Sequence, residues 1–432
     1  MRISRFDWDG TDPEGLAGEL RALQPALGEV SDAVARIIDE VAHGGDEAVL
    51  DAERRFGGTA PESLRVEPEA IGAAREAIPA DLREALELAA DNIRRVAEAE
   101  AMADLRVTLP QSHSVRLRSV PLAAAGAYAP GGTAAYPSTA LMCCVPARVA
   151  DVDRVALASP PGPGGVVHTA VLAVGAIAGA DEVYAMGGAQ AIAALALGTE
   201  SVEPVDVVVG PGNRYVQEAK RQLAGRVGID GVAGPSELMT ILDGGAELRW
   251  IGLDLCSQAE HGDDGLLVAA AVEPSLLDAL EREVTELSDA REGVRAAPLA
   301  LVQVPSLGAA VELANAVAPE HLELAVADAD QLSLQVRSAG CMFLGNTGAT
   351  AFGDYAAGSN HVLPTGGAGR YTGPLGPSVF RRRIATVRIT QKAARELAPA
   401  VATLARAEGF PVHAESVEAR LEGGNSDRGD QQ

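Results

Sequence analysis

The feature that most constrains the fold is a regular alternation of short apolar segments with Ala-rich helical segments over residues 123–344. A first series contains the apolar segments RVALASP, EVYAMG and VDVVVGPG, and a second runs from ELMTILD through LLVAAAV and LALVQVP to CMFLG. Parallel strands need a crossover connection, which is usually a helix. The order therefore predicts two doubly wound parallel sheets, each covered by helices.

The composition agrees with this architecture. Hydrophobic residues make up 47% of the 432 residues but aromatic residues only 3%, so the cores must consist of Ala, Val, Leu and Ile. Such cores are typical of helices packed on parallel strands. Residues 31–102 read as two helices followed by a longer one that begins at a proline. We expect an α/β protein with two incomplete Rossmann-like domains and helical N-terminal and C-terminal extensions.

Charge and cysteine content exclude several classes of partner. The chain carries 35 Lys and Arg against 60 Asp and Glu, a net charge of −25, which repels nucleic acid and anionic membranes. No apolar run approaches the roughly 20 residues of a membrane-spanning helix. The four cysteines show no CxxC spacing, and the first ten residues have no apolar signal core. These features predict a cytoplasmic location with reduced thiols.

Three glycine-containing turns follow strands, where doubly wound sheets bind ligands. They are YAPGGTAAYPST (128–139), MGGAQA (186–191) and GPGNRY (210–215), and their polar side chains include Tyr128, Gln190 and Asn213. Backbone N–H groups in such turns can bind a pyrophosphate. Neither GxGxxG nor GxxxxGK[ST] occurs, so the motifs support dinucleotide binding less than the architecture does. The alternative is that these glycines are only sterically necessary.

Polar residues gather in a few short segments. In CSQAEHGDD, a continuing helix would place Gln258 and His261 on one face, where they could share a ligand, although the stretch taken alone favours a polar helix end. Residues 345–380 form a Gly/Pro/Thr-rich loop of a length typical of functional loops. The other histidines in polar contexts are His321, His361 and His413, whereas we interpret His43, His113 and His168 as structural.

Taken together, these segments resemble the histidinol dehydrogenase family. The resemblance covers nearly the whole chain and is carried, in order, by YAPGGTAAYPSTALM, GGAQAIAALALGTE, VVVGPGNRYVQEAKRQL, GIDGVAGPSE, LCSQAEHG, NAVAPEHLEL, GDYAAGSNHVLPTGGAGRY and EGFPVH. It implies a four-electron oxidation of L-histidinol, through L-histidinal, to L-histidine with two NAD⁺ and one zinc ion per subunit. This is the last part of histidine biosynthesis.

The resemblance also implies a set of site residues. His321 would be the general base, and Glu320 would activate the water that adds to the aldehyde. The implied zinc ligands are Gln258, His261, Asp354 and His413. The implied NAD contacts are Tyr128, Gln190 and Asn213. Substrate would be bound by the zinc ligands, by the catalytic pair, and by Ser138, Ser236, His361 and Glu408.

Two alternatives stay open for individual residues. Ser236 could be a helix N-cap, a role that serine fills often. The Cys256 thiol could replace the attacking water, but a cysteine on an apolar helix face without a nearby cation is usually inert, so we favour the water route.

The family pattern further implies a homodimer that exchanges its C-terminal segments, so that Glu408 and His413 complete the partner subunit's site. The expected division of the chain has five parts: an N-terminal extension (1–24), a discontinuous first Rossmann-like domain (25–127 and 237–374), a second one that carries the NAD-binding turns (128–236), a C-terminal helical segment (375–421) and a disordered tail (422–432).

Other functions fit part of the pattern. The chain could oxidise another small amino- or sulfo-alcohol, act as a zinc hydrolase in which Glu320 drives water onto a carbonyl, or bind metal without turnover. Retention of both the metal set and Glu408 favours histidinol. Either zinc or manganese could be the metal in the cell.

Overall fold

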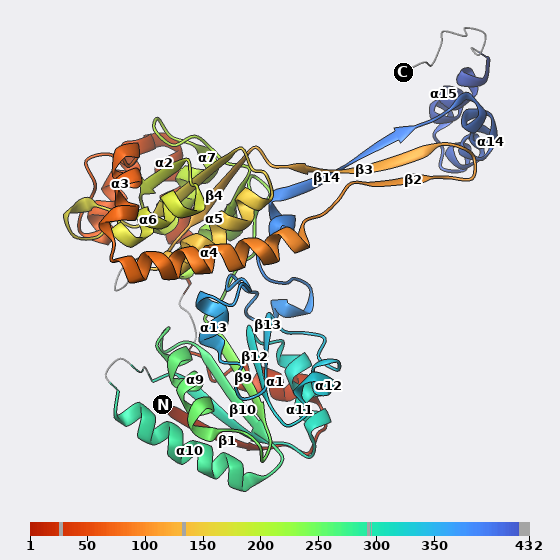
Figure 1. The fold of residues 1–432 in the computed structure, drawn as a ribbon. Coiled ribbons are helices and arrows are strands. Elements are labelled where there is room, and N and C mark those ends of the chain that lie inside the picture. Colours follow the sequence, from red (N-terminus) through yellow and green to blue (C-terminus); the bar gives the residue numbers. More distant parts are fainter. Residues whose placement is uncertain (26–28, 132–134, 292–293, 295, 423–432) are drawn as a thin grey trace. The chain divides into compact units, whose positions relative to one another are not determined.

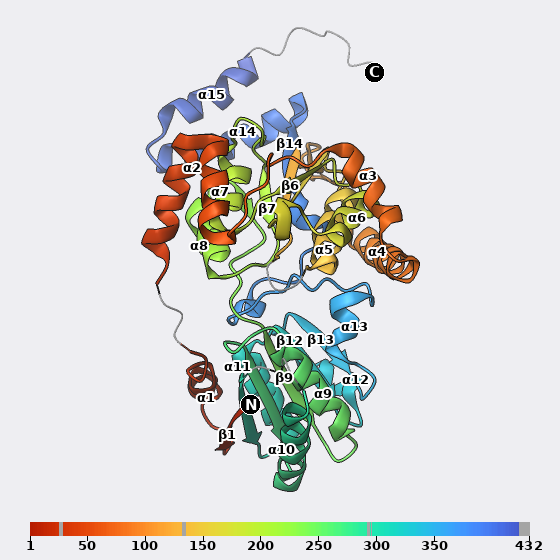
Figure 2. The same cartoon turned by 90° about the vertical axis from the view of Figure 1, so that its left-hand side faces the viewer.

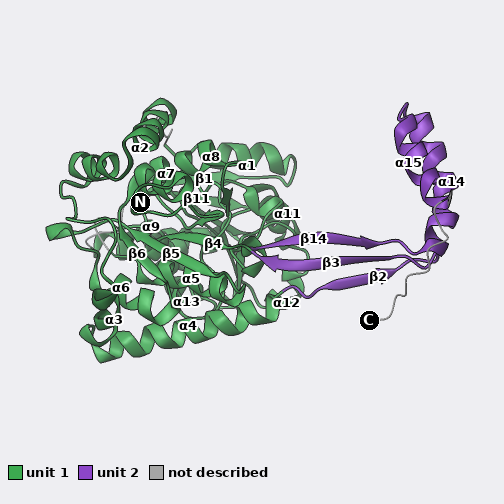
Figure 3. Ribbon diagram, turned by 90° about the horizontal axis from the view of Figure 1, so that it is seen from above, with its two compact units in different colours: residues 1–101, 122–380 green, residues 102–121, 381–432 purple. Residues whose placement is uncertain are grey.

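A computed structural model describes residues 1–25, 29–131, 135–291, 294 and 296–422. The chain divides into two compact units, which Figure 3 distinguishes by colour. Unit 1 comprises residues 1–101 and 122–380, and unit 2 comprises residues 102–121 and 381–432. The tail expected to be disordered lies outside the described residues, except for Glu422, which ends the last helix.

Unit 1 contains a six-stranded sheet in which every strand pairing is parallel. Its order is β1-β11-β10-β9-β12-β13. Figure 1 labels β1, β9, β10, β12 and β13 of this sheet. The strands are β1 (Arg2–Asp7), β9 (Glu237–Leu242), β10 (Leu266–Ala271), β11 (Pro298–Gln303), β12 (His321–Ala325) and β13 (Cys341–Leu344). The first strand of the chain thus completes a sheet whose other strands lie more than 200 residues later in the sequence.

Helices cover both faces of this sheet because successive strand residues point to opposite sides. Met239 and Ile241 of β9 pack against α1, α11 and α12, whereas Leu238 and Leu242 pack against α9 and α10. The helices are α1 (Pro13–Arg21), α9 (Leu248–Ala259), α10 (Pro274–Asp289), α11 (Leu307–Val317) and α12 (Ala329–Ser333), and the short α13 (Thr350–Tyr355) follows β13. Two apolar cores result, one on each face.

A five-stranded parallel sheet of order β6-β5-β4-β7-β8 forms the rest of unit 1. Figure 2 shows α2, α7 and α8 on one side of it and α3 to α6 on the other. Its strands are β4 (Ala124–Tyr128), β5 (Arg154–Ser159), β6 (Glu182–Ala185), β7 (Val207–Val209) and β8 (Gly228–Ile229). Its helices are α2 (Ser31–Ala52), α3 (Pro68–Ala77), α4 (Ala80–Glu100), α5 (Pro137–Val149), α6 (Thr169–Ala178), α7 (Gly188–Leu197) and α8 (Arg214–Leu223).

The helical expectations for the N-terminal region are confirmed. Residues 31–52 contain two helical stretches, because Gly45 has a non-helical backbone conformation (φ 55°, ψ −139°) within α2. A π-helical turn, η1 (Glu53–Gly57), continues α2, and α4 begins directly after Pro79. These helices form the cover of the five-stranded sheet.

Unit 2 combines an antiparallel sheet with two helices. The sheet has the order β14-β3-β2, and α14 packs against α15 around Ala402, Ala405 and Ala414. The elements are β2 (Leu105–Thr108), β3 (Ser114–Pro121), β14 (Arg381–Arg388), α14 (Gln391–Ala407) and α15 (Pro411–Glu422). The C-terminal segment expected to be helical therefore also contains a strand. None of the described helices is long and apolar enough to span a membrane.

The predicted α/β class with two parallel, helix-covered sheets is confirmed. The antiparallel sheet of unit 2 was not expected, because β14 reads as an Arg-rich exposed segment and its pairing partner β3 lies more than 250 residues earlier in the chain.

Candidate functional site

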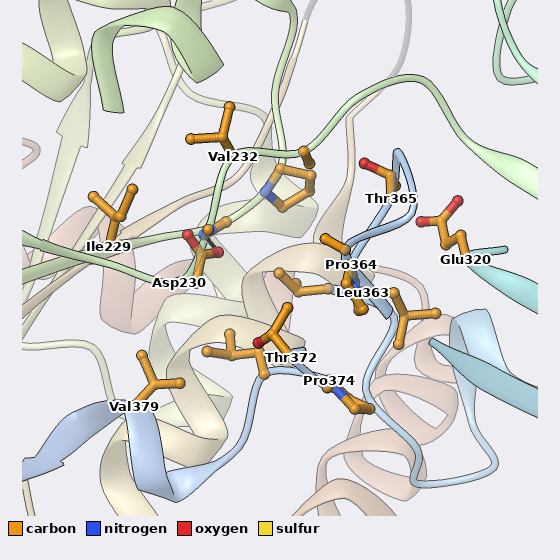
Figure 4. A pocket seen from close by; sticks show the side chains of 18 of the residues that line it. Ile229, Asp230, Val232, Glu320, Leu363, Pro364, Thr365, Thr372, Pro374 and Val379 are labelled. Atoms are coloured by element: carbon orange, nitrogen blue, oxygen red, sulfur yellow. Dashed lines mark hydrogen bonds between the residues drawn. The ribbon is translucent and has the colours of Figure 1, made fainter. Parts of the chain in front are cut away.

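A cavity of about 850 Å³ lies within unit 1 and collects residues from both parallel sheets. Gly210, Gly212 and Asp230 line it from the segments that follow β7 and β8, and Ser236 and Glu320 line it from the segments that precede β9 and β12. Figure 4 shows Asp230 and Glu320 among these side chains. Its volume is typical of a pocket for a small molecule or cofactor.

Glu320 and His321 stand at the beginning of β12, and both side chains are buried. The His321 Nδ1 atom lies 3.6 Å from Glu320 Oε2, and the His321 Nε2 atom lies 3.5 Å from Asp354 Oδ1. The imidazole ring also packs against Phe343, with 5.9 Å between the ring centroids. The predicted acid and imidazole are therefore adjacent in space, and Asp354 faces the imidazole from the other side.

Burial and charge shift the pKa values of this group. Burial raises the pKa of Glu320 to about 7. Burial alone would lower the pKa of His321, but the facing carboxylates of Glu320 and Asp354 more than reverse this and raise it to about 9. Burial would raise the pKa of Asp354, yet the contact with His321 and the nearby histidines hold it below its ordinary value. Buried carboxyl and imidazole groups that shift one another's pKa values in this way are suited to proton transfer.

Glu237 contacts both Glu320 and His321, and the sequence pattern missed it. Its backbone N–H donates to Glu320 Oε2 (2.9 Å), and its carbonyl oxygen lies 3.2 Å from His321 Nδ1. Its own buried carboxylate pairs with Arg21 at 2.5 Å and accepts the backbone N–H of Gly366. An acidic residue at the first position of an otherwise apolar strand was the available signal, because such a buried charge needs a partner.

The four predicted metal ligands are divided between the two units. Gln258 is buried near the end of α9, and its Nε2 atom has no hydrogen-bond partner among the described residues. The helix ends at Ala259, in agreement with the alternative of a polar helix end, and in the turn that follows the His261 N–H donates to the Gln258 carbonyl oxygen (3.2 Å). The charge of His261 makes the smallest of the contributions that lower the pKa of Asp354.

These donors agree with zinc in their chemistry. A buried carboxamide left unpartnered, an imidazole and a carboxylate are N and O donors that zinc accepts. No group of three His, Cys, Asp or Glu residues that could hold a metal occurs in the described part of the chain. The set in unit 1 would thus need the Gln258 amide and a further ligand. The remaining predicted ligand, His413, is exposed on α15 in unit 2.

The loop after α13 is tied to α5 through His361. The His361 Nδ1 atom lies 2.7 Å from the Asp354 carbonyl oxygen, so this nitrogen carries the proton and donates. Its Nε2 atom then accepts from Thr139 Oγ1 at 3.0 Å, next to the predicted substrate residue Ser138. Burial lowers the pKa of His361, in keeping with a neutral ring. Thr139 is a second residue that sequence reasoning missed.

The predicted NAD contacts occupy turns of the five-stranded sheet whose N–H groups are partly engaged already. The Gly187 N–H donates to Glu53 (2.7 Å), and the Gly188 N–H donates to the Tyr128 hydroxyl (3.1 Å). The Gly210 N–H donates to Asp230 Oδ2 (2.8 Å). A pyrophosphate at these particular N–H groups would have to displace oxygen atoms of the chain itself. Part of the turn at residues 128–139, namely residues 132–134, lies outside the described residues.

The other predicted residues have definite places. Asn213 caps α8, since its Oδ1 accepts the N–H groups of Tyr215 (3.0 Å) and Val216 (3.2 Å). Ser236 precedes a strand, so the helix N-cap alternative is wrong. Burial raises the pKa of the Cys256 thiol, which disfavours a nucleophilic thiolate. Glu408 is exposed at the end of α14 in unit 2.

Asp254 and Glu323 form a buried carboxyl pair that makes the stability of the fold depend on pH. Burial and the neighbouring Asp254 raise the pKa of Glu323 to about 8, and Thr240 Oγ1 donates to Glu323 Oε2 (3.0 Å). In the unfolded chain this carboxyl has the ordinary glutamate pKa of 4.5. The folded chain therefore holds more protons between these two pH values, and the stability that Glu323 contributes falls as pH rises through this window.

We expect Glu323→Gln to stabilise the protein at pH 8.5 but much less at pH 5. Glutamine can keep the hydrogen bond from Thr240 and does not ionise. The gain at pH 8.5 should be at least about 1 kcal/mol, or roughly 2–4 °C in Tm. Thermal unfolding of both proteins at both pH values measures it, with exposed Glu312→Gln as the matched control. An equal change in Tm at the two pH values would contradict the explanation that the raised pKa of Glu323 makes stability depend on pH.

Comparison with known proteins gives one consistent family. The family model described as histidinol dehydrogenase matches residues 22–421. The chain is 42% identical over 404 residues to the histidinol dehydrogenase of Chromobacterium violaceum, with 91% of this chain and 93% of that protein covered. It is 43% identical over 408 residues to that of Ruegeria pomeroyi, with 91% and 93% covered. The crystal structure of histidinol dehydrogenase from Elizabethkingia anophelis is similar with a TM-score of 0.90 at 29% identity, and 99% of each chain is covered.

Proposed function

The chain belongs to the histidinol dehydrogenase family, and we propose that it oxidises L-histidinol through L-histidinal to L-histidine, with two NAD⁺ and one zinc ion per subunit. The observation that carries this proposal is the cavity of unit 1, which joins Ser236, Glu320 and His361 to the Gly210–Gly212 turn that leads to Asn213. Three predicted substrate residues thus share one space with the turn that precedes the predicted cofactor residue Asn213, and this supports a reaction in which substrate and cofactor bind side by side.

The catalytic pair divides the proton transfers. His321 accepts the hydroxyl proton of the alcohol as a hydride leaves the carbon that bears this hydroxyl. In the second oxidation it accepts a hydroxyl proton of the hydrate as the second hydride leaves the same carbon. Glu320 accepts a proton from the water that adds to the aldehyde. If Asp354 bound the zinc ion, its carboxylate would hold the proton on His321 less strongly. The imidazole could then act as a base.

Zinc and NAD⁺ would supply the remaining chemistry when bound. Zinc held by Gln258, His261, Asp354 and His413 would orient the imidazole and amino nitrogens of the substrate. NAD⁺, contacted through Tyr128, Gln190 and Asn213, would supply the hydride acceptor. The chain itself contributes the remaining positioning: Glu237 fixes Glu320 and His321, and Thr139 fixes His361.

We also propose that two copies of the chain form a homodimer and exchange unit 2, so that His413 and Glu408 complete the partner subunit's site. Unit 2 buries few apolar side chains within itself and leaves many large ones exposed, which supports an association. The exposed residues are Leu105, Val107, Ile384, Val387, Ile389, Val401, Leu404, Phe410 and Val412. We propose a second copy of this chain as the partner of unit 2, because unit 2 carries two of the predicted ligand-binding residues, Glu408 and His413.

The product stoichiometry tests the proposed reaction. With L-histidinol and excess NAD⁺, we expect about two NADH for each L-histidine formed, because two hydrides leave one carbon. L-Histidinal as substrate should give about one. A chelator should abolish turnover, and added zinc should restore it. Absence of NADH would reject the dehydrogenase reaction on histidinol, and turnover of another small amino- or sulfo-alcohol in its place would identify the alternative substrate class.

A further inference from the structure

Glu53 is a buried carboxylate placed against the N-terminus of α7, and no step of the proposed reaction uses it. Its side chain is only 2% exposed, although it belongs to the short π-helical turn η1. The Oε1 atom accepts two hydrogen bonds, from the Gly187 N–H (2.7 Å) and from Gln190 Nε2 (2.8 Å). A buried charge is retained at such a position only when its partners are well arranged.

The same cluster includes Tyr128. Its hydroxyl oxygen accepts the N–H of Gly188 (3.1 Å), and the charge of Glu53 adds to burial in raising the pKa of this hydroxyl to about 12. Tyr128 ends β4, Gln190 lies in the first turn of α7, and Glu53 follows α2. Three segments of unit 1 therefore meet around one carboxylate, and two of them carry predicted NAD contacts.

We infer that Glu53 is a positioning residue for the cofactor, an inference that rests on the proposed use of NAD. Gln190 Nε2 donates to Glu53, and no described residue donates to the Oε1 atom of the same amide, so this oxygen is left for a ligand. A Cβ on Gly188 would lie 2.7 Å from this oxygen, and glycine leaves room beside it. Gln190 therefore recognises a hydrogen-bond donor of the dinucleotide, such as a ribose hydroxyl or an amide N–H.

Glu53 also has a consequence for anions. The N-terminus of a helix ordinarily attracts a phosphate, because its first N–H groups are free and the dipole is positive there. At α7 the first two glycine N–H groups already bond to Glu53 and Tyr128. The carboxylate takes the place of an anion here, so these two N–H groups are not available to the pyrophosphate of the dinucleotide.

A charge exchange between the two side chains tests the pairing. Gln190→Glu alone places two buried carboxylates together and should weaken NAD⁺ binding at least about tenfold. In the double variant Glu53→Gln/Gln190→Glu, residue 53 donates, residue 190 still offers an oxygen to the cofactor, and the Kd should return to within about threefold of wild type. Glu53→Gln alone keeps an acceptor oxygen and should have a small effect. The exposed Glu84→Gln is the matched control.

The Kd for NAD⁺ is measured by titration calorimetry without histidinol, and the KM values for both substrates are measured beside it. A double variant as weak as Gln190→Glu would overturn the inference, as would a histidinol KM that changes in parallel with the NAD KM. Wild-type protein that binds NAD⁺ but forms no NADH from histidinol would reject the proposed reaction and leave the pairing standing. Wild-type protein that binds no NAD⁺ would overturn the inference.

Discussion

A dimer composed of one His321→Asn subunit and one His413→Asn subunit is expected to show about half of the wild-type activity, although each variant alone is inactive. In the mixed dimer, the subunit that keeps His321 receives the intact His413 from its partner if unit 2 is exchanged. One of its two sites then has every residue. Without exchange, each site lacks one of the two imidazoles and the mixed dimer stays inactive.

The single variants should fail for different reasons. Removing His321 takes away the general base, which costs about 10²- to 10⁴-fold in kcat. Asparagine at 321 cannot accept the proton but keeps a side chain able to hydrogen-bond to Glu237. Removing His413 takes away a proposed zinc ligand, and bound zinc measured by mass spectrometry should fall together with activity.

Affinity tags of two kinds allow the mixed dimer to be purified directly. A mixed dimer of His321→Asn and Glu320→Gln is the matched control, because both residues lie in unit 1 and neither site can be complete. His43→Asn, an exposed histidine on α2, controls for the substitution itself. An inactive mixed dimer of the first kind would reject the exchange, and half-activity in the Glu320 control would show that the recovery has another cause.

The sequence was sufficient to predict the two parallel sheets because apolar segments and helical periods alternate with little interruption. The expected division grouped residues 25–127 with residues 237–374, yet the helices of residues 31–100 cover the five-stranded sheet. The sequence does not decide this, since an amphipathic helix buries its apolar face equally well against either sheet. Glu53 illustrates the consequence. In DAERRF it reads as part of a solvated helix end, and only the packing of α2 against α7 places it beside Gln190.

The candidate site was predictable where it follows strands. Tyr128 and Gly210 end or follow β4 and β7, as expected for ligand positions in doubly wound sheets. On the six-stranded sheet, however, Ser236, Glu320 and His321 stand at the beginning of β9 and β12. No rule of strand and turn pattern directs attention there, so the resemblance to a family supplied these residues. The supporting contacts from Arg21, Glu237 and Thr139 depend on tertiary structure.

The second large effect is expected from Lys220→Met, which should lower the free energy of unfolding by about 3–5 kcal/mol. Lys220 is 1% exposed and forms an ion pair with the buried Asp230. Its Nζ atom also donates to the Gly210 carbonyl oxygen (3.0 Å), while Asp230 accepts the Gly210 N–H (2.8 Å). Methionine fills a similar volume but leaves Asp230 as an unpaired buried charge.

The ion pair fixes a turn that cannot easily move. Gly210 has a φ of +120°, and a Cβ there would lie 2.1 Å from the Tyr128 carbonyl oxygen. Lys220 and Asp230 hold both polar groups of this residue, and the turn then leads along the cavity to Asn213. Loss of the pair should therefore raise the NAD KM of the protein that stays folded, whereas the histidinol KM should change less.

Scanning calorimetry measures the stability change, which corresponds to a fall of roughly 10 °C in the Tm of the affected transition. Lys392→Met is the matched control, because its side chain is exposed and surface ion pairs contribute only about 0–1 kcal/mol. Lys220→Met/Asp230→Asn should recover part of the loss, since asparagine removes the unpaired charge and still accepts the Gly210 N–H. If Lys220→Met lowers the Tm no more than Lys392→Met does, the pair does not stabilise the turn.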